Sequence, residues 1–225
     1  MAINATNEGK PRELIPAGNY VARCYQMIHI GSVTENIMGE EKLLNKVRIG
    51  WELPTELRVF KEENGEQPMV TSKEFTLSMN EKATLRAMLQ SWRGKAFTED
   101  EAKCFDITKL LGVPCMLNII HETSKKGSVY EKIAGITPMP KGMVCPPQVN
   151  PTVKWEYDNP DWMFFEILPQ FIREKIESSK EYKALAAKAV AAQKEPAAQP
   201  IPPMNPGASE FDNFMQSAQV EELPF

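Results

Sequence analysis

The stretch Lys46-Val47-Arg48-Ile49-Gly50-Trp51-Glu52-Leu53 alternates strictly between two kinds of side chain. Every second residue is apolar (Val47, Ile49, Trp51 and Leu53), and the residues between them are charged or lack a side chain (Lys46, Arg48, Gly50 and Glu52). An alternation with a period of two residues is typical of a β-strand that buries one face. Pro54 follows directly and ends the run, so the segment predicts a half-buried strand in a mainly β fold.

Four further segments have the composition of strands, and one has that of a helix. Residues 18–30, 69–79, 115–121 and 129–136 are rich in β-branched and aromatic side chains, and the last two flank a basic turn at residues 123–127. Between the third and fourth strands, residues 81–92 change to a helical period. Leu85, Met88, Leu89 and Trp92 fall on one stripe there, and Gly94 ends it.

Three strands, a helix and two strands are the element order of the oligonucleotide-binding (OB) fold. The predicted fold is therefore mainly β, a five-stranded OB Greek-key barrel at residues 14–138 with a helix between strands 3 and 4. A flexible N-terminus is expected at residues 1–13. This order of elements alone also fits other small barrels and α+β sandwiches.

The remainder of the chain predicts a strap, a helical extension and a tail. Residues 139–158 are rich in proline and predict an extended strap. Residues 159–186 predict a C-terminal helical segment that Pro169 divides. The apolar face of this segment consists of Trp162, Phe165, Leu168, Phe171, Ile172 and Ile176. Packing of that face on the barrel of the same chain is favoured over pairing with a second copy, because the strap gives it the reach.

Residues 187–225 predict a disordered acidic tail, because alanine, proline and glutamine supply little apolar bulk. From Glu195 onward the chain carries five acids and no lysine or arginine, whereas residues 1–194 hold 26 bases and 25 acids. A near-neutral body with an acidic arm is typical of nucleic-acid-binding proteins.

The last five residues, Glu221-Glu222-Leu223-Pro224-Phe225, resemble the acidic tip of bacterial single-stranded-DNA-binding proteins, which closes with Ile-Pro-Phe. Residues 15–23, 48–54 and 91–97 look like phage-encoded single-stranded-DNA-binding proteins with an OB fold. The resemblance implies that Glu221, Glu222, Leu223, Pro224 and Phe225 dock replication or recombination proteins, such as a helicase, polymerase, primase or nuclease. Short acidic and aromatic peptides are suited to basic, apolar grooves on such partners.

A single-strand channel needs cations for phosphates and flat side chains for bases. The candidate phosphate contacts are Arg23, Lys46, Arg48, Lys73, Arg93, Lys95, Lys125, Lys126 and Lys132, and the candidate stacking residues are Tyr25, Phe75, Trp92 and Tyr130. Several of these have a competing structural interpretation. Phe75 and Trp92 are in phase with aliphatic neighbours and fit a core equally well, and a lysine pair in a turn is often only solvated.

Enzyme sites are not supported by the residue patterns. Two histidines are too few for most hydrolytic metal centres, the carboxylates lack two-metal spacing, and no phosphate-binding loop is present. Cys24 and His29 lie five residues apart on one strand and so point to opposite faces, which argues against a zinc site with Cys115 and His121. Buried thiols in a reducing compartment are the favoured alternative. We therefore expect no catalytic residues, no metal and no cofactor.

These observations predict a cytoplasmic protein that binds single-stranded DNA without reading its sequence and recruits partners through its tip. A strand-annealing recombination protein and a replication adaptor that binds only proteins remain as alternatives. The N-terminal residues have neither a basic-then-apolar pattern nor an apolar run of membrane length.

Overall fold

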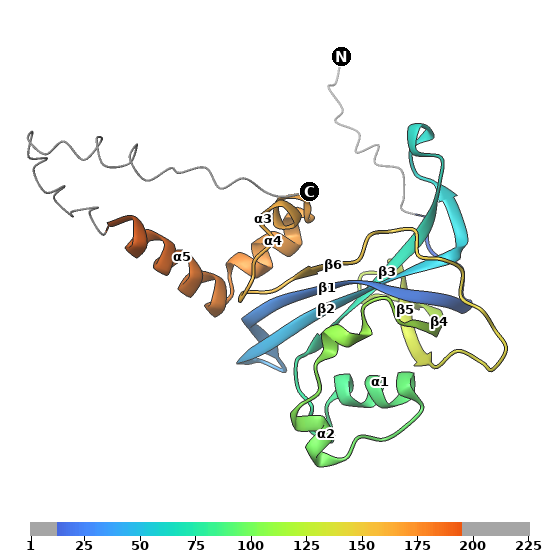
Figure 1. Cartoon of the computed structure of the whole chain (residues 1–225), viewed down its shortest axis with the longest axis horizontal. Helices are drawn as coiled ribbons and strands as arrows, with labels where there is room; N and C mark the ends of the chain where they lie inside the picture. The colour runs from blue at the N-terminus through green and yellow to red at the C-terminus, as the bar shows by residue number, and fades with distance from the viewer. Residues whose placement is uncertain (1–12, 195–225) are drawn as a thin grey trace, which may run out of the picture. The chain divides into compact units, whose positions relative to one another are not determined.

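The structure, a computed structural model, describes residues 13–194 (Figure 1). Its centre is a six-stranded sheet in which five strands lie in the order β3-β2-β1-β4-β5 and a short β6 pairs with β1. The strands are β1 (Gly18–Ile37), β2 (Glu40–Val59), β3 (Glu66–Thr76), β4 (Pro114–Thr123), β5 (Val129–Thr137) and β6 (Val153–Trp155). The mainly β prediction is confirmed, with one more strand than expected.

The sheet is antiparallel except for β6, which runs parallel to β1. It does not close into a barrel, because among the described strands β3 and β5 form the two ends of the order and share no ladder. A side chain spans the gap: Lys73 Nζ on β3 donates a hydrogen bond to the carbonyl oxygen of Ile133 on β5, at 3.0 Å. A cavity of about 250 Å³ lies between β3, β5 and α1 (Thr84–Arg93).

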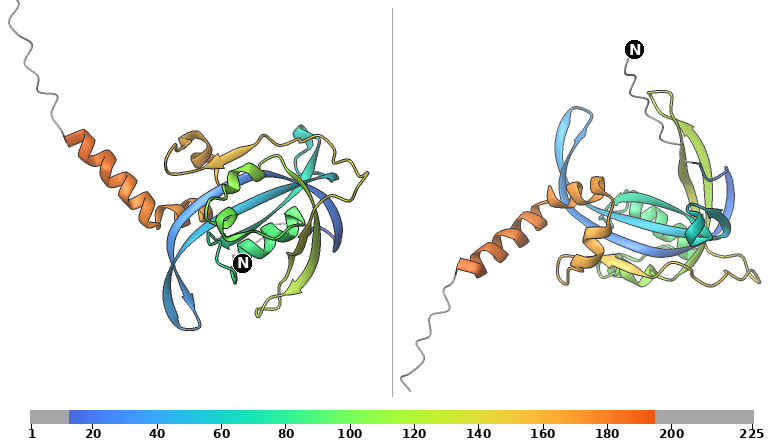
Figure 2. Two further views of the ribbon diagram at one scale, coloured as in Figure 1. Left: turned by 60° about the horizontal axis from the view of Figure 1, so that its bottom comes forward. Right: turned by 90° about the horizontal axis from the view of Figure 1, so that it is seen from above.

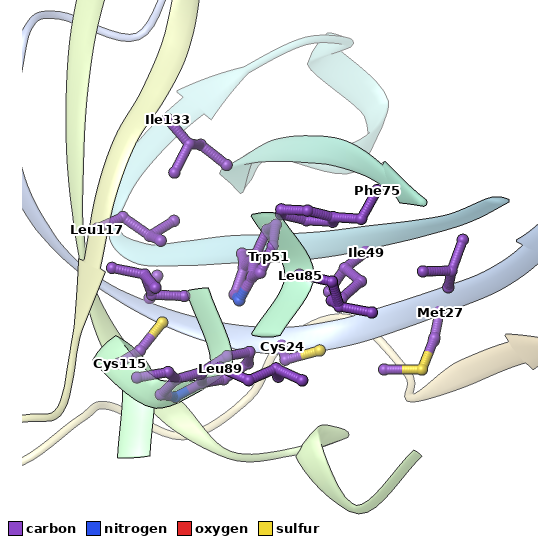
Figure 3. Packing of buried hydrophobic residues seen from close by; sticks show 14 of the residues in the cluster. Cys24, Met27, Ile49, Trp51, Phe75, Leu85, Leu89, Cys115, Leu117 and Ile133 are labelled. Carbon is purple, nitrogen blue, oxygen red and sulfur yellow. The ribbon is translucent and has the colours of Figure 1, made fainter. Parts of the chain in front are cut away.

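The inner face of the sheet carries the first hydrophobic core (Figure 3). Val47, Ile49, Trp51 and Leu53 are all buried in it, as their alternation predicts. Helix α1 covers this face with Leu85, Leu89 and Trp92 and ends at Gly94, which adopts the left-handed conformation (φ 66°). The helix α2 (Glu99–Lys103) lies on the same side of the sheet (Figure 1), and short 3₁₀ turns occupy Glu62–Asn64 and Ile107–Leu110.

The opposite, outer face of the sheet carries a second core. Ile28, Ile30 and Val33 of β1 pack there against Trp155 and the C-terminal helices. These helices are α3 (Trp162–Ile167), α4 (Gln170–Glu177) and α5 (Lys180–Lys194). The helical segment therefore packs on the sheet of its own chain, as favoured above. Pro169 separates α3 from α4, as predicted.

Two members of the predicted apolar face are not buried. Phe165, Leu168, Ile172 and Ile176 lie in the second core, but Trp162 and Phe171 are exposed. Phe171 lies in α4, which begins after Pro169, so the helical phase of α3 does not continue to it. Its ring lies beside the outer face of β2. Trp162 is the first residue of α3, and its ring still packs against Trp155, Phe165 and Tyr182.

The proline-rich strap is held against the sheet by a cross-strand pair, Arg23 and Glu52. The Arg23 guanidinium donates to the carbonyl oxygens of Gly112 and Pro146, at 2.8 and 2.9 Å. The Glu52 carboxylate is fully buried and accepts hydrogen bonds from the backbone of Val149 and from Asn150. The polar face of the 46–53 strand is therefore covered by the strap at this point.

None of the helices within residues 13–194 combines the length and apolar character needed to cross a membrane.

Candidate nucleic-acid interface

The β4–β5 arm, defined as residues 122–132, presents the most accessible of the predicted phosphate contacts. It extends at a steep angle from β2 and β3 (Figure 2). The turn at its tip is closed by hydrogen bonds from Ser124 N–H to the Ser128 carbonyl (2.8 Å) and from Gly127 N–H to the Ser124 carbonyl (2.9 Å), with Gly127 at φ 84°. Lys125 and Lys126 are exposed at this tip and have no ion-pair partner within the described part of the chain.

Tyr130 and Lys132 lie on one face of the same arm and share a partner. Both contact the Glu122 carboxylate, through the Tyr130 hydroxyl at 2.9 Å and Lys132 Nζ at 2.6 Å. The hydrogen bond from Lys132 lowers the pKa of Glu122, and the hydrogen bond to Glu122 raises the pKa of Tyr130. Tyr130 is 41% exposed, and its hydroxyl is held by the hydrogen bond to Glu122.

Lys73 lies on β3 but reaches toward the arm across the open gap. Partial burial and the nearby charge of Lys132 lower the pKa of Lys73. Its ammonium group also lies over the Phe75 ring, 5.5 Å from the centroid. Phe75 itself is only 3% exposed and belongs to the first core, so its ring is not available for stacking (Figure 3).

Tyr25, Lys46 and Arg48 form a second group on the outer face of β1 and β2. Lys46 pairs with Glu35 at 2.7 Å, and Arg48 pairs with Glu74 at 3.3 Å. Tyr25 is partly buried, and burial together with the charge of Glu52 raises its pKa while Arg48 opposes this shift. Tyr25 and Arg48 are therefore brought together, as a mixed aromatic and basic surface requires.

The other predicted contacts are engaged elsewhere. Trp92 is buried and donates its indole N–H to the Pro114 carbonyl at 3.1 Å, which places it in the core. Arg23 binds the strap, as described above. Arg93 and Lys95 both pair with Glu101, at 3.2 and 3.8 Å, and the Arg93 guanidinium lies 4.3 Å from the centroid of the Phe97 ring.

Two relevant residues were missed by the sequence reasoning. Glu122 was not considered, although its place across the hairpin from Tyr130 follows once the register of β4 and β5 is known. Phe171 was assigned to the buried face of the helical segment, and only its position in the folded chain reveals that it is exposed.

The predicted docking residues Glu221, Glu222, Leu223, Pro224 and Phe225 lie outside the described residues, and partner recruitment stays a prediction. Within residues 13–194, no group of three or more His, Cys, Asp and Glu side chains is arranged to hold a metal ion.

No protein-family model matches this chain, and neither the curated proteins nor the solved structures contain a significant match to it.

Proposed function

We propose that this protein binds single-stranded DNA without sequence preference and has a variant of the OB fold. The order β3-β2-β1-β4-β5, with a helix between β3 and β4, agrees with that of an OB fold, which is a partly open barrel. Such folds bind single strands on the face of strands 2 and 3 and on the loops that join strands 1–2 and 4–5. The β4–β5 arm corresponds to the second of these loops.

The observation that carries the proposal is the composition of this arm. Two lysines with no ion-pair partner among residues 13–194 lie at its tip, and an exposed tyrosine and a third lysine follow along one face. Lysines supply a charge that displaces counterions from the phosphates, and an exposed ring supplies a surface for any base. Neither feature distinguishes one base from another, so the binding would be independent of sequence.

The first prediction concerns the arm. The protein should bind oligo-dT, and Lys125→Ala/Lys126→Ala should weaken this binding several-fold at low salt. If both lysines contact phosphates, the slope of log K against log salt should become shallower by roughly 1.4, since each contact on a single strand contributes about 0.7. Fluorescence anisotropy of labelled oligo-dT over a range of salt concentrations measures both quantities.

The matched control is Lys82→Ala/Lys141→Ala, which removes the same charge from two exposed lysines outside the arm. Its salt slope should equal that of the unmodified chain. Equal slopes in all three proteins would remove the arm from the interface. Binding that cannot be detected even at low salt would instead favour the protein-only adaptor.

One observation favours that adaptor as the second candidate. Five of the predicted phosphate contacts, namely Lys46, Arg48, Arg93, Lys95 and Lys132, already pair with carboxylates. A surface whose cations are neutralised in this way attracts a polyanion less strongly. The oligo-dT titration separates the two candidates directly.

The second prediction concerns Glu122, which competes with phosphate for Lys132. Glu122→Gln should tighten oligo-dT binding a few-fold, because it removes a negative charge from the arm and releases Lys132 from its ion pair. The salt slope should steepen by roughly 0.7 if the released ammonium group gains one phosphate contact. Asp100→Asn is the control, since Asp100 is an exposed acid that pairs with Lys103 on α2. If Glu122→Gln and Asp100→Asn tighten binding equally, the gain reflects net charge and not the arm.

A further inference from the structure

Phe171 is a large aromatic residue that the fold leaves exposed. Ile172, which follows it, and Ile176, one turn after Ile172, are buried in the second core, yet 59% of Phe171 is accessible. Single exposed apolar residues are common on protein surfaces, so the exposure of Phe171 becomes informative only through the groups that surround its ring.

The Arg48 guanidinium of β2 lies over the Phe171 ring, 5.7 Å from its centroid. Arg48 shares the outer face of β2 with Gly50, two residues further along the strand. The Tyr25 ring lies close to Gly50, since a Cβ atom at that position would be 3.6 Å from Tyr25 Cε1. The outer face therefore carries a row in which the cationic Arg48 lies between two aromatic residues, Phe171 and Tyr25. We refer to these three residues as the outer row.

Ion pairs fix the helix that carries Phe171. Lys175 Nζ of α4 lies 2.5 Å from a Glu74 carboxylate oxygen and 3.3 Å from a Glu35 carboxylate oxygen. These hydrogen bonds outweigh partial burial and raise the pKa of Lys175, so the lysine stays charged. Three cations, Lys46, Arg48 and Lys175, share the two carboxylates. These ion pairs hold α4 beside the outer face of β2.

We propose that the outer row is a second base-binding site, in which a nucleobase of a single strand stacks on Phe171 and the Arg48 guanidinium. This inference rests on the proposed function and extends it to the C-terminal helical segment. A planar base suits the row because both a phenyl ring and a guanidinium offer flat faces on which a base can stack. Helix α4 then completes the binding surface as well as covering the second core.

The test compares Phe171→Ala with Ile167→Ala. Ile167 is an exposed apolar residue of α3, and it has no aromatic ring on which a base could stack. Phe171→Ala should weaken oligo-dT binding by about tenfold, the loss typical of one stacked base, while Ile167→Ala and Phe171→Tyr leave the affinity unchanged. The salt slope should stay constant in Phe171→Ala, because the ring carries no charge. A lowered slope together with a lowered melting temperature would show that α4 had been displaced, and this result would overturn the stacking role.

Photocross-linking gives an independent readout on the unmodified chain. An oligonucleotide with 5-iodouracil should cross-link to the peptide that contains residues 170–175, and the cross-link should disappear in Phe171→Ala. If the unmodified chain binds oligo-dT and responds to the Lys125 and Lys126 changes, but Phe171→Ala binds normally and no cross-link maps to α4, this inference fails and the proposed function stands. If the unmodified chain does not bind, both fail.

Discussion

Replacing Glu52 with alanine is expected to lower the free energy of unfolding by about 3–5 kcal/mol. The Glu52 carboxylate is fully buried and accepts hydrogen bonds from Val149 N–H at 3.0 Å, Asn150 N–H at 2.8 Å and Asn150 Nδ2 at 2.8 Å. Removing the acceptor leaves three donors of the strap without a partner, and each costs about 1–3 kcal/mol unless water reaches it. Urea denaturation followed by tryptophan fluorescence measures the loss.

Two further variants separate this effect from a general change of charge. Glu52→Gln keeps one acceptor oxygen and should lose roughly half as much stability, whereas Glu66→Ala removes an exposed acid and should change it by no more than about 0.5 kcal/mol. The strap should also open in Glu52→Ala, so trypsin should cleave after Lys141 faster than in the unmodified chain. A Glu52→Ala protein as stable as Glu66→Ala would mean that the strap contributes nothing to the fold.

Glu52 shows which features of the fold the sequence could predict and which it could not. The alternation at residues 46–53 correctly assigns the inner face, because the period of two residues is a local property of the strand. The same pattern places Glu52 on the opposite face, but it does not reveal that Glu52 is buried there, because the covering segment lies nearly a hundred residues later. The extension of β1 and β2 beyond the predicted strands was also missed. Residues 40–45 are mostly exposed and show no strict alternation, and β2 continues through Pro54, at which the sequence predicted its end.

In the candidate site, too, the sequence could predict only the features that depend on local chemistry. A basic turn with Gly127 places Lys125 and Lys126 at an exposed tip, and local chemistry suffices for this. The ion pairs of Lys46 and Arg48 depend on strand register and on the docking of α4, which the composition of either segment does not specify. Phe171 was misplaced because the helical period was continued through Pro169, where the chain begins a new helix.

Replacing Gly31 with alanine should cost about 3 kcal/mol or more, since it combines backbone strain with overpacking. Gly31 lies on β1 at φ 91°, where an L-residue is strained. A Cβ atom there would lie 2.8 Å from Glu181 Oε2, 2.8 Å from the Tyr157 hydroxyl and 2.9 Å from Ser179 Cβ. These groups cannot withdraw freely, because the Tyr157 hydroxyl donates to the Ile30 carbonyl at 2.7 Å and Ser179 is fully buried.

Gly39 provides the control that isolates the overpacking. It adopts the same φ of 91° at the turn between β1 and β2, but a Cβ atom there would have no neighbour within 4 Å among residues 13–194. Gly39→Ala therefore carries only the backbone strain, about 1–2 kcal/mol, and the excess loss in Gly31→Ala measures the close packing of residues 157–181 on β1. Thermal and urea denaturation of both variants give this difference. Equal losses would show that the start of α5 is not held tightly on the sheet. A larger loss at Gly31 would establish that α5 is anchored there, as the hydrogen bonds from Ser32 to the Glu181 carboxylate at 2.6 and 2.7 Å require.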